Sequence, residues 1–78
     1  MAHIKRTEYS FEVYDNTEGQ NRIASFTGDA PFLVPNKGDV VTLSDTREEI
    51  IVEVVRHIIA SPEDGVMMHC VVVFGERQ

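Results

Sequence analysis

Cysteine is nearly absent from this chain: Cys70 is the one cysteine among 78 residues, so no internal disulfide can form. The residues around Cys70 are apolar, which predicts a buried, reduced thiol in an intracellular protein. No stretch approaches the roughly 20 consecutive apolar residues of a transmembrane helix, and the N-terminal residues lack the apolar segment of a secretory signal. We therefore expect a cytoplasmic protein that makes no membrane contact.

Basic residues are also scarce. Seven Lys and Arg stand against thirteen Asp and Glu, which gives a formal net charge of -6. This balance disfavours nucleic acids and anionic membranes as partners, because binding to either relies on cationic side chains that neutralise phosphate. Glycine-rich phosphate loops and nucleophile-base-acid combinations are missing too, so the sequence predicts no enzyme and no cofactor.

The chain is long enough for one small domain over residues 1–78, with 42% hydrophobic residues for a single core. Residues 6–13 alternate strictly, with Thr7, Tyr9, Phe11 and Val13 on one face, which predicts a half-buried strand. A polar loop over residues 15–21 and a shorter strand over residues 22–27 complete a first hairpin.

Residues 28–38 contain two prolines and two glycines, which predicts an irregular connection. Phe32 and Val34 are the side chains by which it would pack onto the core. A tight turn over residues 35–38 needs a positive φ at Gly38, and a third strand over residues 39–44 follows.

The segment from Arg47 to Ala60 fits two structures. Its apolar residues recur at a spacing that suits one stripe of an α-helix, and Thr46 with Glu49 matches a capping box. Half of the segment, however, is Ile or Val, whose branched side chains favour a strand. We predict a strand, with a helix over residues 46–60 as the alternative.

A strand here would form a hairpin with residues 66–74 across a loop over residues 61–65. If Ala60 lies opposite Val66, one face forms the core, interrupted only by Arg56 opposite Cys70. The apolar members of that predicted core face are Val52, Val54, Ile58, Met68, Val72 and Phe74.

Five strands in hairpin-rich order predict an all-β fold, namely a small, partly open antiparallel barrel. One spacing, followed by an Ile- and Val-rich strand, is carried by Pro35, Gly38, Asp39, Val41 and Leu43. It resembles the way small SH3-like barrels enter a central strand. The resemblance covers about ten residues, is at the level of the fold alone and implies no ligand.

The same register places His57 opposite His69 on the other face, where two imidazoles could hold a divalent metal or sense pH. Zinc normally takes four ligands, and no third is evident, since Cys70 points to the opposite face and His3 lies near the terminus. Cys70 could itself be reactive only if a cation such as Arg56 lay beside it.

The last strand is apolar on both faces over residues 71–74, whereas one small core covers only one face. The other face therefore requires a cover. That cover is either the loop containing Phe32 or another protein chain, including a second copy. The predicted interface residues are Val55, Met67, Val71 and Val73. We expect a non-enzymatic protein-protein interaction module of the accessory or adaptor type. The alternative is an acidic inhibitor, of the kind that phages encode, which mimics a nucleic acid and occludes a basic binding site.

Overall fold

The computed structural model describes residues 4–16, 21–43 and 46–78, and all regular structure in these ranges is β. The strands are β1 (Arg6–Tyr14), β2 (Arg22–Gly28), β3 (Val40–Leu43), β4 (Glu48–Glu63) and β5 (Val66–Arg77). The predicted all-β class is confirmed. The helix considered for residues 46–60 is not formed, because residues 46–47 are in a turn and residues 48–60 belong to β4.

The five strands form one sheet in the order β2-β1-β5-β4-β3. Each of the pairs β1–β2, β3–β4 and β4–β5 is antiparallel, whereas β1 and β5 run parallel. The prediction of a purely antiparallel sheet is therefore wrong at this central pairing. The reason is that β1 and β5 are distant in the chain, so no hairpin turn constrains their relative direction.

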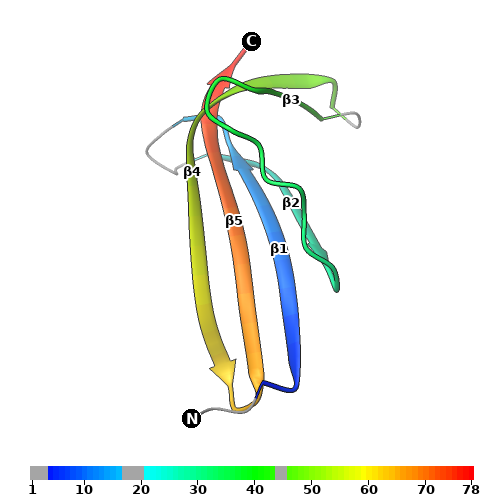
Figure 1. Ribbon diagram of the computed structural model, residues 1–78. Coiled ribbons are helices and arrows are strands. Elements are labelled where there is room, and N and C mark those ends of the chain that lie inside the picture. Colours follow the sequence, from blue (N-terminus) through cyan, green and yellow to red (C-terminus); the bar gives the residue numbers. More distant parts are fainter. Residues whose placement is uncertain (1–3, 17–20, 44–45) are drawn as a thin grey trace.

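The sheet curls until it nearly closes into a barrel at one end, and it is open and flatter at the other (Figure 1). β2 pairs with β1 only from Tyr9 onward, and β3 pairs with β4 only up to Ile51. Beyond these points β1, β5 and β4 continue alone toward the turn that joins β4 to β5. We call this part the three-stranded end.

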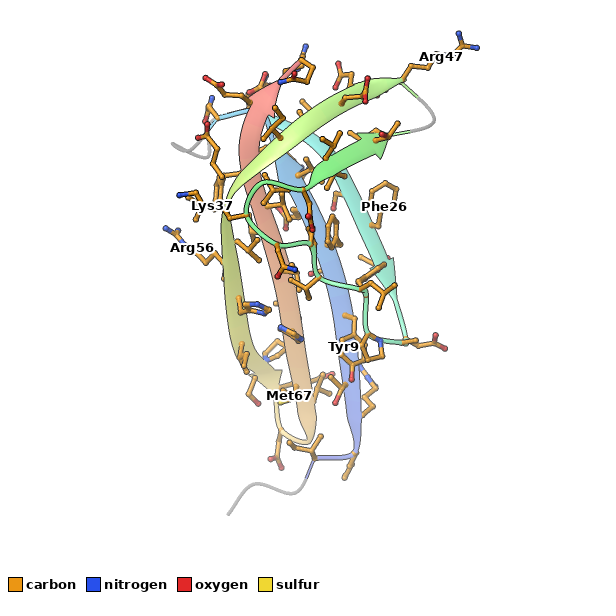
Figure 2. The ribbon with its side chains drawn as sticks, turned by 45° about the horizontal axis from the view of Figure 1, so that its top comes forward. Tyr9, Phe26, Lys37, Arg47, Arg56 and Met67 are labelled. Atoms are coloured by element: carbon orange, nitrogen blue, oxygen red, sulfur yellow. The ribbon has the colours of Figure 1, made fainter. Side chains whose placement is uncertain are left out.

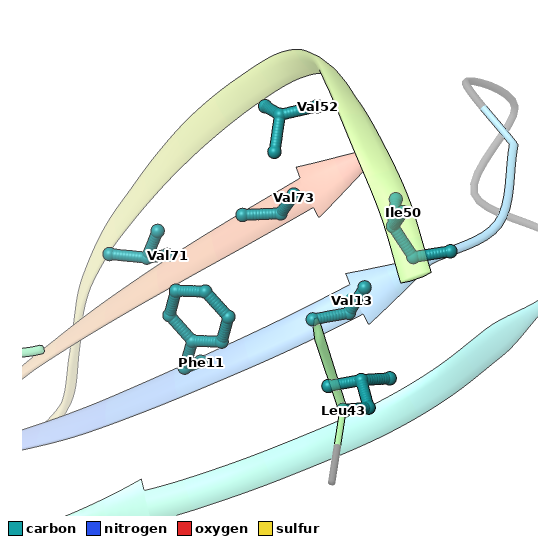
Figure 3. Close-up of a cluster of buried hydrophobic side chains, with 7 residues drawn as sticks. All are labelled: Phe11, Val13, Leu43, Ile50, Val52, Val71 and Val73. Carbon is teal, nitrogen blue, oxygen red and sulfur yellow. The ribbon is translucent and has the colours of Figure 1, made fainter. Parts of the chain in front are cut away.

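The core lies inside the curled end, where side chains from four strands meet (Figure 3). Phe32, from the connection between β2 and β3, packs on this cluster with its ring 5.7 Å from that of Phe11. The predicted packing of this connection onto the core is thus confirmed for Phe32. The buried residues of this cluster are Phe11, Val13, Leu43, Ile50, Val52, Val71 and Val73.

The hairpin of β4 and β5 is formed, but its register differs from the predicted one. Ala60 lies opposite Met68 instead of Val66, because β4 extends to Glu63 and the chain reverses only at Asp64 and Gly65. Gly65 has a φ of 81°, a conformation that glycine adopts without steric cost. The displacement is two residues, so from Val54 to Ala60 the side chains predicted to share a face still share it, while their cross-strand partners change.

The predicted core face is wrong except at Val52. Both faces of this hairpin are apolar, and the sheet curls so that the face with Val71 and Val73 turns inward. A bulge between Val52 and Val54 reverses the alternation along β4. Val52 therefore faces the core, whereas Val54 and Ile58 are on the outer face and are 41% and 44% exposed. On β5, Val72 lies on that outer face, and the inward-facing partner of Val55 is Val73.

The turn before β3 forms as expected, with Gly38 at a φ of 94°. Gly38 and Asp39 continue the pairing of this segment with β4 through backbone hydrogen bonds to Val52. In the described ranges no helix is long and apolar enough to cross a membrane.

Candidate functional site

His57 on β4 and His69 on β5 lie side by side next to the three-stranded end, at the level where Tyr9 of β1 pairs with β2. Their facing residues are Val71 and Ile59, respectively, so the two histidines are diagonal neighbours instead of the direct pair expected from the sequence. Histidine side chains can span this diagonal. The distance from His57 Nδ1 to His69 Nε2 is 2.9 Å, within hydrogen-bond range.

The two imidazole rings meet edge to edge. Their centroids are 5.2 Å apart and their planes are inclined by only 19°. The facing nitrogens are 2.9 Å apart, and the rest of the centroid separation equals the distance from each ring centre to its facing nitrogen. The two nitrogens therefore lie on the line between the ring centres. His57 is exposed, His69 is half-buried, and the ring of Tyr9 approaches His69 edge-on at 6.2 Å. When both rings are neutral, this hydrogen bond forms only if one of the two facing nitrogens carries a proton.

Further metal ligands are not gathered around this pair. Among the residues that the structure describes, no group of three or more His, Cys, Asp or Glu side chains could hold one ion. His3 lies outside the described residues. The geometry thus provides two imidazole donors on an accessible surface.

Cys70 lies on the opposite, outer face of β5 and is buried. Its cross-strand neighbour is Ile58, whereas Arg56 lies opposite Val72. The charged group near the thiol is the Glu12 carboxylate, whose Oε2 is 3.6 Å from Sγ. A nucleophilic cysteine needs a neighbouring cation, so these contacts fit a packed cysteine better than a reactive one.

The outer face of the curled end is covered by polar side chains that lie along it. Phe74 is buried because Tyr14 stacks on its ring at 5.3 Å and the Arg56 guanidinium lies 5.5 Å from its centroid. Tyr14 donates a hydrogen bond of 2.8 Å to Glu12. This bond to the carboxylate, and secondarily burial, raises the pKa of the Tyr14 phenol above its ordinary value.

The predicted interface residues are mostly covered within the chain. Val71 and Val73 are 2% and 0% exposed and belong to the core. Val55 is half-buried against the same core, and Met67 is half-buried at the three-stranded end. Of the two covers considered for this face, the internal one is therefore present, with Phe32 as part of it. Val71 and Val73 are therefore covered within the chain, whereas Val55 and Met67 stay partly accessible.

An apolar cavity of about 480 Å³ occupies the seam between the edge strands β2 and β3. Phe26 of β2 lies opposite Phe11 and borders this cavity, yet it is 44% exposed (Figure 2). Leu33, in the connection that runs along the seam, is 97% exposed. The exposure of Phe26 was not predictable from the sequence, because it depends on how far the barrel closes.

The second accessible apolar feature is the edge of β4 from residue 53 to residue 63, which we call the free edge. β3 covers β4 only over residues 48–51, and Gly38 and Asp39 bond to Val52. In the part of the chain that the structure describes, no strand pairs with this outer edge of β4 beyond that point, while the other edge pairs with β5. A signal for this edge existed in the sequence, since the predicted third strand is much shorter than the fourth.

Comparison of the chain with protein-family models, with curated proteins and with solved structures finds no match.

Proposed function

We propose that this chain is a non-enzymatic protein-protein interaction module that associates by strand pairing at the free edge of β4. The observation that carries the proposal is the length of that edge, residues 53–63, over which outward-pointing backbone groups have no partner among the described residues. Such a row of N–H and C=O groups is a template for another strand. We expect the module to act in the cytoplasm, where its single cysteine stays reduced.

The side chains of the free edge favour association over solvation. Val54, Ile58 and Ile59 are 41%, 44% and 68% exposed, and they lie on both faces of the strand. Natural edge strands are commonly protected by lysines, prolines or short length. β4 contains no lysine, and its one proline, Pro62, stands next to the turn. Between the bulge at residue 53 and Pro62, Arg56 is the one charged side chain of this edge, so its middle has little of this protection.

A second copy of β4 fits this edge. When two copies of β4 pair antiparallel around a two-fold axis, the same face of each copy lies on the same side of the joined sheet. A residue can therefore lie opposite only a residue whose side chain points to that same face. Centring the axis on Arg56 sets two guanidinium groups against each other, and centring it on Ile58 sets Glu53 against Glu63. Both arrangements are therefore disfavoured by repulsion between like charges.

Centring the axis on His57 avoids both repulsions. Residues 53–61 of the two copies then pair, with Val54 facing Ala60 and Val55 facing Ile59. The apolar residues of one copy meet apolar residues of the other, and no acid faces an acid. We therefore assign this register to the dimer.

The test is the mass of the protein in solution, measured by light scattering across micromolar concentrations. We expect a dimer that dissociates on dilution. Ile59→Lys should yield a monomer, since a charge at this exposed position blocks the edge without disturbing the core. Val40→Lys is the matched control, because Val40 is 54% exposed but lies on β3. A monomeric wild type, or a dimer broken by Val40→Lys and not by Ile59→Lys, would overturn the proposal.

The acidic nucleic-acid mimic remains the alternative function, and its binding should respond differently to salt. Decoy binding to a basic enzyme weakens steeply as salt rises, whereas apolar strand pairing between two copies of charge -6 holds or strengthens. Among the residues that the structure describes, five acidic side chains pair with arginines of the same chain, which lowers the local negative potential. They are Glu8, Glu12, Asp15, Glu48 and Glu63.

A further inference from the structure

We propose that His57 and His69 form a two-imidazole site for a divalent transition-metal ion such as Zn²⁺. The site lies on one chain, so it does not require the strand pairing proposed above. Imidazole is a preferred ligand of zinc, copper and nickel ions, and the two rings present facing nitrogens on an accessible surface.

The spacing of the two nitrogens is close to what an ion needs. Two nitrogens bound to one tetrahedral zinc ion, each at about 2.0–2.1 Å, lie about 3.3 Å apart. His57 Nδ1 and His69 Nε2 are 2.9 Å apart, so a separation of a few tenths of an ångström and a tilt of the rings are sufficient. His57 is exposed and can make this movement by rotating its side chain.

The ion would replace the shared proton of the imidazole pair. In the hydrogen-bonded pair one facing nitrogen donates and the other accepts. Binding requires both facing nitrogens to be deprotonated, which a neutral imidazole achieves by carrying its proton on the other ring nitrogen. Both histidines stay neutral in this exchange, because the shared proton moves to the other nitrogen of its own ring. No co-reactant is needed.

The surroundings leave the remaining coordination positions open. The residues beside the pair on the same face are Val71, Ile59 and Tyr9, of which the first two are apolar. Since the described residues supply no third ligand, water or a donor from another chain would complete the coordination. In the proposed dimer register, His57 of each copy faces the other, which would bring the two pairs together.

The experiment is a Zn²⁺ titration of the full chain, followed by the NMR signals of the histidine rings and by calorimetry. We expect the His57 and His69 signals to shift together, with one ion bound per chain. Removing a residue that only hydrogen-bonds to a metal ligand weakens metal binding by about 10–100-fold. His57→Ala and His69→Ala each remove a ligand itself, so each should weaken Zn²⁺ binding by at least about tenfold.

Three controls keep the test specific. His3→Ala removes the histidine outside the pair, Cys70→Ser removes the thiol, and both should leave the affinity unchanged. Ile58→Lys places a charge on the free edge but on the opposite face of β4 from the histidines, so it should bind Zn²⁺ as a monomer, which separates the metal site from strand pairing. Ring signals that do not move in excess Zn²⁺, an unchanged affinity of His57→Ala, or loss of binding in Ile58→Lys would each overturn the proposal.

Discussion

Gly75 packs directly against the backbone of Ile51, where β4 bends across the end of β5. A Cβ at position 75 would overlap the Ile51 carbonyl oxygen and the side chain of Ile50. The bulge between Val52 and Val54 begins at the residue that faces Gly75. The absence of a side chain at this one position therefore allows the curvature that closes the core.

We expect Gly75→Ala to lower the free energy of unfolding by about 3 kcal/mol, the upper part of the range for overpacking, because the obstructing atom belongs to the backbone. Urea unfolding would measure the loss. Gly28→Ala is the matched control: its Cβ would make an ordinary contact of 3.8 Å with Phe32. Equal effects of the two substitutions would contradict this explanation of the bend.

Val73 is fully buried between the strands of the core. We expect Val73→Ala to cost about 1.5–3 kcal/mol, since it removes two methyl groups and leaves a cavity. Val40→Ala, at a position that is 54% exposed, should change stability by no more than about 0.5 kcal/mol. Denaturant midpoints of the two variants provide the comparison, and a Val73 variant as stable as the Val40 variant would show that the core is placed wrongly.

Tyr14 should make stability depend on alkaline pH. Its folded-state pKa is raised above the unfolded value, first by the hydrogen bond to Glu12 and then by burial. The resulting stabilisation is complete below the unfolded pKa of about 10 and is lost as pH rises through the folded pKa. Tyr14→Phe lacks this contribution. The difference in stability between wild type and Tyr14→Phe should therefore be constant below about pH 10 and shrink as pH rises above that value; a difference that stays unchanged there would contradict the assignment.

Arg47 has a φ of 59° in the turn between β3 and β4, a region that costs a non-glycine residue about 1–2 kcal/mol. Arg47→Gly relieves this cost but loses entropy on folding, so we expect a net gain of up to about 1 kcal/mol. Arg47→Ala keeps the Cβ and removes the charge, which makes it the control. A thermal melt in which both variants respond alike would assign the effect to the charge.

Several features were predictable because they depend on neighbouring residues. The alternation over residues 6–13 and the Ile and Val content of residues 47–60 identify β1 and β4. The contact between His57 and His69 was found despite a wrong register, since a displacement of two residues preserves the face of each side chain. Gly38 was placed correctly from its turn alone.

The sequence by itself determined the class of the fold, its strands and which side chains share a face, because backbone preference and alternation are local properties. Only the tertiary structure decided that β1 runs parallel to β5, that Val71 and Val73 are core, and that β4 has a free edge. These outcomes depend on which distant strands pair and on where one bulge reverses the alternation. Local patterns carry no information about either, because each half of the last hairpin is apolar on both faces.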